Sequence, residues 1–314
     1  MGAVVIAVML SLGISPVAWA RGSALPVEQI AVGVFVIPSP LADPGLDNRG
    51  RVVNTGFIVG ESGVVVIDSG ANYAHGQAII ASIERQTRKP IRLLINTHPH
   101  PQNVLGNSAF AAKRIPILAT KATRLAMNER CPLCLKALGD SVGADAMKGT
   151  SIRLPDEDHQ GVERQTIAGR RLRLLHFGHG HTEGDMAIFD EESGTLFAGD
   201  LAYHGQIPHL AESNTLGWIA ALEQLAALPI RRLVPGRGAT GEAVDLNATG
   251  RYLRELRTTV ERAYAQGLSA TEIIGRAELP EFAGWHGYAT RHGRNVQHLY
   301  FEIEREDLAR GDTR

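Results

Sequence analysis

The sequence is short of cysteine, of clustered charge and of long apolar stretches, and each shortage narrows what the protein can be. Only two of the 314 residues are cysteines, so any internal disulfide is a single local one. Lysine and arginine together number 32 and aspartate and glutamate 33, with no basic block, which argues against a nucleic-acid partner. Beyond the N-terminus no apolar stretch is long enough to cross a bilayer, so we expect no membrane span in the mature chain.

The N-terminus has the pattern of a secretory signal peptide. Residues 1–20 contain no charged side chain, and an apolar run over residues 3–12 is followed by Ala18-Trp19-Ala20, a small-x-small cleavage pattern. We therefore predict cleavage after Ala20 and a periplasmic or secreted protein, with an uncleaved anchor as the alternative. The mature chain, residues 21–314, is long enough to bury a large core as one or two domains.

The two cysteines, Cys131 and Cys134, are spaced CPLC and leave three interpretations open. In an exported protein they can form a local disulfide, whose small loop stabilises little. Pro132 is typical of the first position of a helix, and a cysteine at a helix N-terminus has a lowered thiol pKa that favours redox chemistry. The third interpretation is half of a zinc site, although no second cysteine pair exists.

The stretch over residues 93–107 carries the strongest chemical signal. A short apolar run, typical of a buried strand, leads into His98-Pro99-His100. Alternating histidines at a strand end can aim two imidazoles at one point, and neutral imidazole is a common zinc ligand. The flanking prolines stiffen this turn. The stretch therefore predicts part of a metal site, with two solvated loop histidines as the alternative.

Strand-like and helix-like segments alternate along the chain, which predicts an α/β fold with two mixed sheets covered by helices. We expect strands at residues 30–37, 52–59, 64–67, 91–95, 115–119, 150–154, 163–167, 171–176, 186–190, 195–198 and 232–234. We expect helices at residues 73–88, 104–112, 120–138 (interrupted near Cys131), 215–227, 245–266 and 296–304.

Potential ligands follow four of these strands: His98 and His100, the loop HGHTEGD over residues 179–185, Asp200, and the PGR turn ending at Arg237. In this order, over residues 30 to 240, the chain resembles the metallo-β-lactamase fold superfamily. The resemblance implies a four-layer αββα sandwich with metal ligands in loops at the sheet ends. A C-terminal helical segment, about residues 245–314, would pack on it.

Three further segments narrow the resemblance. Residues 96–107, residues 196–200 (LFAGD) and residues 292–296 (HGRNV) are similar to exported zinc metallohydrolases associated with quinoprotein dehydrogenase and sulfur-oxidation systems. This subgroup implies a periplasmic protein as a possible partner, beside a small-molecule substrate.

The resemblance implies a complete first zinc site and a second site that lacks most of its ligands. His98, His100 and His181 match the three histidines of the first zinc site, and Asp200 matches the aspartate that bridges two zinc ions. The second site departs from the family pattern at three positions, where Gln102 replaces an aspartate and Asn103 and Arg237 each replace a histidine.

These departures change the charge balance of the site. Without a second zinc, Asp200 is a buried carboxylate facing one metal, and an unpaired buried charge is costly. We therefore predict an ion pair between Asp200 and Arg237 that substitutes for the second metal. A neutral amide at Gln102 is consistent with the absence of a second metal, because no anion is needed where no cation binds.

Taken together, the sequence predicts an exported metallohydrolase-like protein with one Zn²⁺ held by His98, His100, His181 and Asp200. Zinc-bound hydroxide would hydrolyse an ester, thioester, lactone or lactam, with Asp200 and Arg237 as catalytic residues. Gln102 cannot act as a base, which removes one route to a nucleophile. The alternative is a non-catalytic binding or accessory protein of a quinoprotein or sulfur-oxidation system.

The other titratable residues have weaker assignments. His176 and His179 are candidates for replacement ligands, and Asp185 and Asp68 for hydrogen bonds that support the loop or a ligand. His204 and His209 either line the pocket or are solvated. The remaining histidines are expected at the surface or in packing: His75, His159, His286, His292 and His298.

Overall fold

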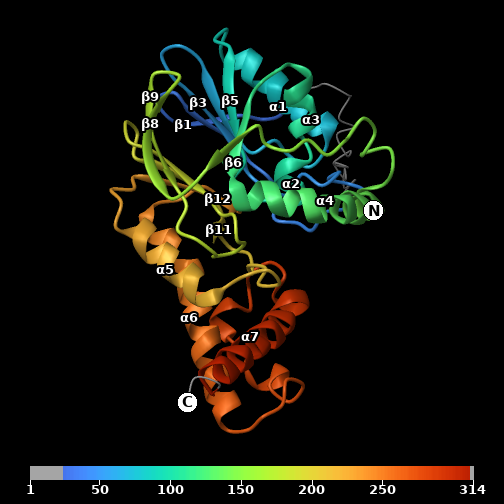
Figure 1. The fold of residues 1–314 in the computed structure, drawn as a ribbon, viewed down its shortest axis with the longest axis vertical. Helices are drawn as coiled ribbons and strands as arrows, with labels where there is room; N and C mark the ends of the chain where they lie inside the picture. The colour runs from blue at the N-terminus through green and yellow to red at the C-terminus, as the bar shows by residue number, and fades with distance from the viewer. Residues whose placement is uncertain (1–23, 312–314) are drawn as a thin grey trace, which may run out of the picture.

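A computed structural model describes residues 24–311 of the chain as two β-sheets packed face to face, with helices on their outer faces (Figure 1). This is the predicted αββα arrangement. A C-terminal arm of helices extends from one end of the sandwich. The predicted signal peptide, residues 1–20, lies outside the described residues.

The first sheet has seven strands in the order β1-β2-β3-β4-β5-β6-β7, antiparallel from β1 to β4 and parallel from β4 to β7. Its strands are β1 (Glu28–Ala31), β2 (Val34–Ile37), β3 (Thr55–Val59), β4 (Val64–Ile67), β5 (Ile91–Ile95), β6 (Ile117–Thr120) and β7 (Glu157–His159). The single strand expected over residues 30–37 is instead a hairpin, because Gly33 turns the chain with a φ of 73°.

The second sheet has five strands in the order β12-β11-β10-β9-β8. Its strands are β8 (Val162–Ile167), β9 (Arg170–Leu175), β10 (Ala187–Asp190), β11 (Thr195–Tyr203) and β12 (Arg232–Arg237). All nine residues of β11 are buried. The parallel pairing of β11 with β12 brings the ends of both strands, with Asp200 and Arg237, to one edge of the sandwich.

Helices cover both outer faces. Those beside the first sheet are α1 (Tyr73–Gln86), α2 (Pro101–Val104), α3 (Asn107–Ala112) and α4 (Lys121–Val142), and those beside the second are α5 (Thr215–Ala226) and the first part of α6 (Ala243–Ala265). The last helix, α7 (Tyr288–Gly311), packs on α6 and not on a sheet. One apolar cluster fills the space between the two sheets, with Val65 and Ile95 from one and Leu174 and Phe197 from the other. Further clusters join each sheet to its helices. Burial of these apolar faces provides the main driving force for the fold.

Other local expectations were also wrong. The single helix expected over residues 104–112 is two helices, α2 ending at Val104 and α3 beginning at Asn107. Residues 150–154 form no strand, and the seventh strand instead begins at Glu157. The helix α4 runs without interruption through Pro132, so this proline does not begin a helix. A proline inside a helix costs about 3 kcal/mol relative to alanine, and the buried residues of α4, among them Met127, Cys131 and Leu138, offset this by packing.

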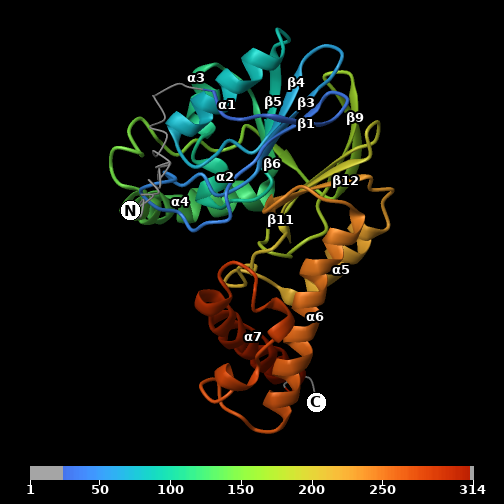
Figure 2. The same ribbon diagram turned by 180° about the vertical axis from the view of Figure 1, so that it is seen from behind.

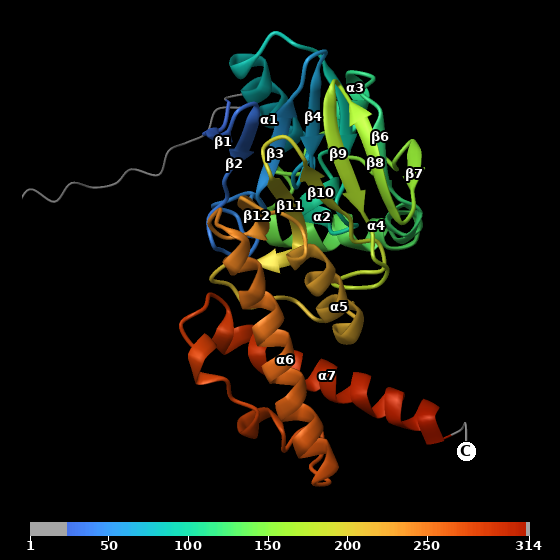
Figure 3. The ribbon, with the colours of Figure 1, turned by 90° about the vertical axis from the view of Figure 1, so that its left-hand side faces the viewer.

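The arm consists of α6, α7 and two short 3₁₀ turns between them, Ile274–Arg276 and Pro280–Phe282. It projects from the α5 side of the sandwich (Figures 2 and 3). The helix α7 is longer than the predicted 296–304. Glu302 on α7 accepts hydrogen bonds from the backbone and hydroxyl of Thr215, at 2.8 and 2.9 Å, which fixes α7 against α5. Within residues 24–311, no helix is both long and apolar enough to span a membrane.

Candidate metal centre

Loops at one edge of the two sheets bring four predicted ligands together. His98 and His100 follow β5, His181 lies in the loop between β9 and β10, and Asp200 lies within β11. One side-chain atom of each residue lies within 4.8 Å of the others. The Nε2 atoms of His98 and His181 are 3.7 and 3.8 Å from Asp200 Oδ2. The His181 Nε2 and His100 Nδ1 atoms are 3.2 Å apart.

Hydrogen bonds fix which nitrogen of each histidine faces the centre. Thr97 Oγ1 donates its proton to Asp68 at 2.8 Å, so His98 Nδ1 must donate to Thr97 Oγ1, at 2.9 Å. His181 Nδ1 donates to the carbonyl of His209 at 3.0 Å. Each bond leaves the Nε2 lone pair of its histidine pointing inward.

Glu212 orients His100 so that its Nδ1 atom, and not Nε2, faces the centre. His100 Nε2 lies 3.9 Å from Glu212 Oε1, so a proton on Nε2 faces the carboxylate and Nδ1 is left as the inward atom. Arg130 on α4 holds the other carboxylate oxygen of Glu212 at 2.5 Å. Three unprotonated imidazole nitrogens therefore converge, as metal binding requires.

The donor set fits a divalent metal. Burial lowers the pKa of His98 to about 3 and holds that of His181 well below its usual range, so both imidazoles are neutral at physiological pH. His98 Nε2 and Asp200 Oδ1 are buried with no hydrogen-bond partner among the described residues. Buried polar atoms rarely lack partners. The lone pairs of His181 Nε2 and His100 Nδ1 face each other at 3.2 Å and repel, and a cation between them would remove this repulsion.

The predicted ion pair between Asp200 and Arg237 is present. Arg237 Nε donates to Asp200 Oδ2 at 3.2 Å, and both side chains are buried, with exposed fractions of 4% and 0%. Burial alone would raise the pKa of Asp200, but the Arg237 guanidinium and the neighbouring histidines hold it well below its usual range. Tyr203 also donates to Asp200 Oδ2, at 2.8 Å. Asp200 is therefore an ionised carboxylate with one oxygen fully engaged.

The backbone around Arg237 is held by Asn54. Asn54 Nδ2 donates to the carbonyls of Pro235 and Gly238 at 2.9 and 2.7 Å, and Asn54 N donates to the carbonyl of Gly236 at 2.8 Å. A Cβ at Gly236 would lie 2.1 Å from Asp200 Oδ1, so only glycine leaves room for the carboxylate. The turn is thus shaped around the ion pair.

The other two departures from the family pattern have different surroundings. Gln102 lines the cavity in front of the metal ligands. Asn103 instead turns into the protein, where its Nδ2 donates to Asp68 Oδ2 at 2.8 Å. Asp68 also accepts from Thr97 N at 2.8 Å, and burial raises its pKa to about 7. Asp68 therefore supports His98 through Thr97, in line with its predicted hydrogen-bonding role.

The histidines near the ligand loop are not part of the cluster. His179 Nε2 bonds the carbonyl of Glu212 at 2.7 Å, and His176 Nδ1 bonds the carbonyl of Asp185 at 2.7 Å. Asp185 accepts from the backbone and hydroxyl of Thr182, at 2.9 and 2.7 Å, which is the predicted loop support. His204 bonds the carbonyl of Ala239.

The other five histidines, His75, His159, His286, His292 and His298, lie apart from the cluster as expected. His75 and His292 are buried, and both hydrogen-bond neighbouring backbone or side chains.

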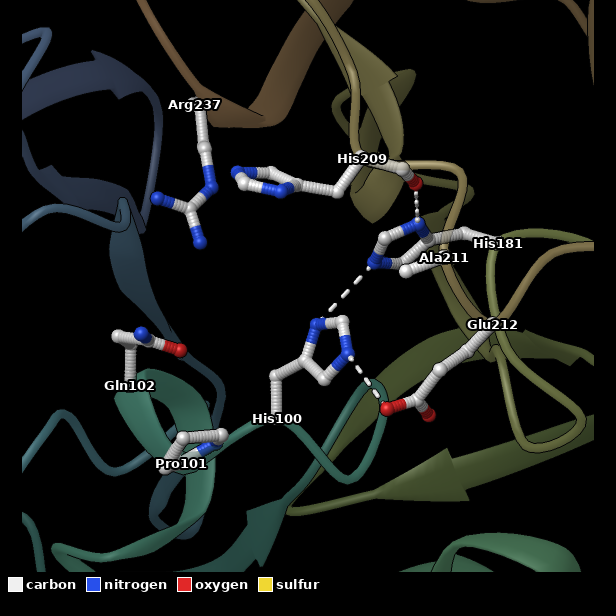
Figure 4. Close-up of a pocket in the computed structure, with 8 residues that line it drawn as sticks. All are labelled: His100, Pro101, Gln102, His181, His209, Ala211, Glu212 and Arg237. Atoms are coloured by element: carbon white, nitrogen blue, oxygen red, sulfur yellow. Dashed lines mark hydrogen bonds and ion pairs between the residues drawn. The ribbon is translucent and has the colours of Figure 1, made fainter. Parts of the chain in front are cut away.

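The cluster opens into a cavity of about 210 Å³ (Figure 4). Arg237 and Gln102 lie on one side of this cavity and His181 and Glu212 on the other, with His209 beside Arg237. The sequence did not point to Glu212 or Tyr203. Glu212 precedes a helix, where an acidic residue needs no special role, and Tyr203 has the apolar surroundings of any strand residue.

The cysteines lie on α4, three residues apart, and both are free thiols, so the structure does not contain the local disulfide. They belong to no group of three or more potential ligands within residues 24–311. A hydrogen bond between the two thiols, together with burial, raises the pKa of Cys131, and the same hydrogen bond lowers the pKa of Cys134 to about 7. Because α4 begins at Lys121, Cys131 does not lie at a helix N-terminus, so that basis for the redox interpretation was wrong. A redox role for the pair itself stays a prediction.

Comparison with known proteins identifies the family. Residues 48–237 match the model of the metallo-beta-lactamase superfamily. The chain belongs to this superfamily. Among solved structures it is similar to a metallo-beta-lactamase from Pontibacter korlensis, with a TM-score of 0.60 and 21% identity over 73% of this chain and 99% of that one. This likeness confirms the predicted fold.

Two relatives of this superfamily member are hydrolases of other kinds. A linear primary-alkylsulfatase from a Pseudomonas species is 21% identical over 79% of this chain and 54% of its own length. A hydroxyacylglutathione hydrolase from Rhodospirillum rubrum is 31% identical over 43% of this chain and 52% of its own length. The chain thus spans about half the length of these curated relatives.

We predict that Arg237→Met destabilises the metal-free protein by about 3–5 kcal/mol, because it leaves the buried Asp200 carboxylate without its cation. The double variant Asp200→Asn/Arg237→Met should lose less, because no charge remains buried. Urea unfolding of the wild type, both single variants and the double variant measures the coupling. Additive losses in this cycle would show that the two charges do not depend on each other.

We also predict selective alkylation of Cys134 in the reduced, folded protein. Its thiol is partly exposed and has a lowered pKa, so its rate of reaction with iodoacetamide should reach half its maximum near pH 7. Cys131 is 1% exposed and should stay unmodified until the protein unfolds. Peptide mass spectrometry across pH 5–10 follows both sites. A midpoint at the ordinary thiol value of about 8.5, or faster labelling of Cys131, would contradict this assignment.

Proposed function

We propose that the protein is a metal-dependent hydrolase that works with one zinc ion. The observation that carries this proposal is the position of the Arg237 guanidinium, 3.2 Å from Asp200 beside a complete three-histidine cluster. Three of the four residues that would build a second metal site are an amide or a cation. The relatives named alkylsulfatase, hydroxyacylglutathione hydrolase and metallo-beta-lactamase support a hydrolytic reaction on a small molecule.

His98, His100 and His181 would hold the ion, with Asp200 at its side. When bound, a zinc ion polarises the substrate's carbonyl oxygen and makes water a stronger nucleophile near neutral pH. Asp200 Oδ2 lies 3.7 and 3.8 Å from the Nε2 atoms of His98 and His181, so this carboxylate would place its negative charge beside the ion and orient the attacking water. Gln102 cannot act as a base but can donate hydrogen bonds to a substrate in the cavity.

Arg237 has two roles in this scheme. It holds Asp200 in its ionised state, and it lines the substrate cavity with a permanent positive charge. A guanidinium there stabilises negative charge that develops on the substrate oxygen during attack. The substrates that suit this chemistry are esters, thioesters, lactones and lactams.

We predict one zinc ion per chain in native mass spectrometry after reconstitution. His181→Ala should lose the ion, whereas His179→Ala, two residues away in the same loop, should keep it because His179 contacts Glu212 and not the cluster. Two zinc ions in the wild type would overturn the role given to Arg237.

A panel of ester, thioester, lactone and lactam substrates tests the reaction with the same variants. Hydrolysis should occur in the wild type and His179→Ala and fall at least 100-fold in His181→Ala, since a metal-dependent step loses most of its rate with the metal. A protein that binds one zinc ion and hydrolyses none of these compounds would instead fit the accessory-protein role.

We propose that the enzyme works outside the cytoplasm, in the periplasm or the medium. Its support is the uncharged N-terminus and the Ala18-Trp19-Ala20 cleavage pattern. Mass spectrometry of the protein recovered from cell fractions should find a mature N-terminus at Arg21 in the exported fraction. An intact N-terminus in the cytoplasmic fraction would disprove export.

A further inference from the structure

A second cavity of about 440 Å³ adjoins the metal-site cavity, and His209 and Ala211 line both. These two residues belong to the loop between β11 and α5. The far wall of the second cavity comes from α7 of the C-terminal arm, including Arg291 and Arg294. The two cavities therefore share one wall, the loop that carries His209 and Ala211.

The second cavity has an excess of positive charge. Arg291 is 5% exposed, and its charge is paired with Asp43, the one carboxylate in the lining. Arg294 is exposed, and among residues 24–311 no acidic side chain forms an ion pair with it. Arg294 is thus the guanidinium of this lining that is left for a ligand.

Contacts between the arm and the loop hold Arg294 at a fixed place relative to the metal ligands. Asn295, next to Arg294, donates to the carbonyl of Pro208 at 2.8 Å. The following residue, His209, accepts the hydrogen bond from His181 Nδ1 through its own carbonyl. Ile207 N also donates to the carbonyl of His286, two residues before α7 begins, at 3.0 Å. One short loop therefore connects α7 to a metal ligand.

We propose that the second cavity binds a carboxylate of the substrate, with Arg294 as the residue that recognises it. The substrate is then an ester or thioester that carries a carboxylate away from the bond to be cleaved. A guanidinium suits this role because it binds a carboxylate through two parallel hydrogen bonds. This inference rests on the proposed hydrolase function and names the substrate class for that site.

The test compares two esters that differ only in charge, the butanoate ester of para-hydroxybenzoate and that of para-hydroxybenzamide. The wild type should prefer the carboxylate ester by about tenfold in kcat/KM, the effect of one charge-assisted hydrogen bond. Arg294→Gln should abolish this preference, mainly by raising KM, and Arg294→Lys should retain part of it. An unchanged preference in Arg294→Gln would overturn the proposal.

Arg310→Gln is the matched control, because it removes the same charge from the same helix about 24 Å farther along. It should keep the wild-type preference, and an equal loss there would show a general charge effect and overturn the role of Arg294. If neither ester is hydrolysed, the hydrolase function fails for these compounds, and calorimetric titration with para-hydroxybenzoate still tests the cavity. Binding to the wild type but not to Arg294→Gln supports the carboxylate site; equal binding, or none to either, refutes it.

Discussion

The buried ion pair between Asp200 and Arg237 is the constraint on which the rest of the site depends. An isolated carboxylate at this depth would be protonated or would destabilise the fold. Two bound zinc ions would neutralise the negative charge of Asp200 with cations from solution, whereas Arg237 neutralises it with a cation of the protein itself. The folded protein can therefore keep Asp200 ionised before any metal binds. The cost is that the guanidinium occupies space and charge that a second cation would need.

Much of the surrounding structure serves to keep this pair and the three histidines in place. Asn54 ties three carbonyls of the turn that carries Arg237, and Gly236 leaves room for the carboxylate. Asp68, Thr97 and the backbone of His209 fix the protonation of His98 and His181. A metal site whose ligands are already oriented loses little entropy on binding. We propose that one ion held by this arrangement supports hydrolysis.

The sequence predicted the fold and the convergence of three histidines with Asp200 because both depend on residues with local signatures. Histidines spaced HPH after an apolar strand, and an aspartate after LFAG, indicate their chemistry wherever the chain places them. The ion pair could be inferred because a charge added at Arg237 and ligands lost at Gln102 and Asn103 make sense only together. Glu212 could not be found this way, since its role depends on a distance to His100 that no local pattern records. The course of α4 through Pro132 depends on packing that outweighs the helix propensity of one residue.

The C-terminal arm also helps to hold the site in place, through the loop between β11 and α5. The HGRNV segment at residues 292–296 lies far along the chain from the metal ligands, yet Asn295 holds the loop whose next residue bonds His181. A helix that only capped the core would need no such contact at the edge of the site. Because the loop is fixed from both sides, a charge on α7 keeps a constant relation to the metal centre. A specificity-determining residue requires such constancy, and this is the ground on which we propose that the arm contributes to the site.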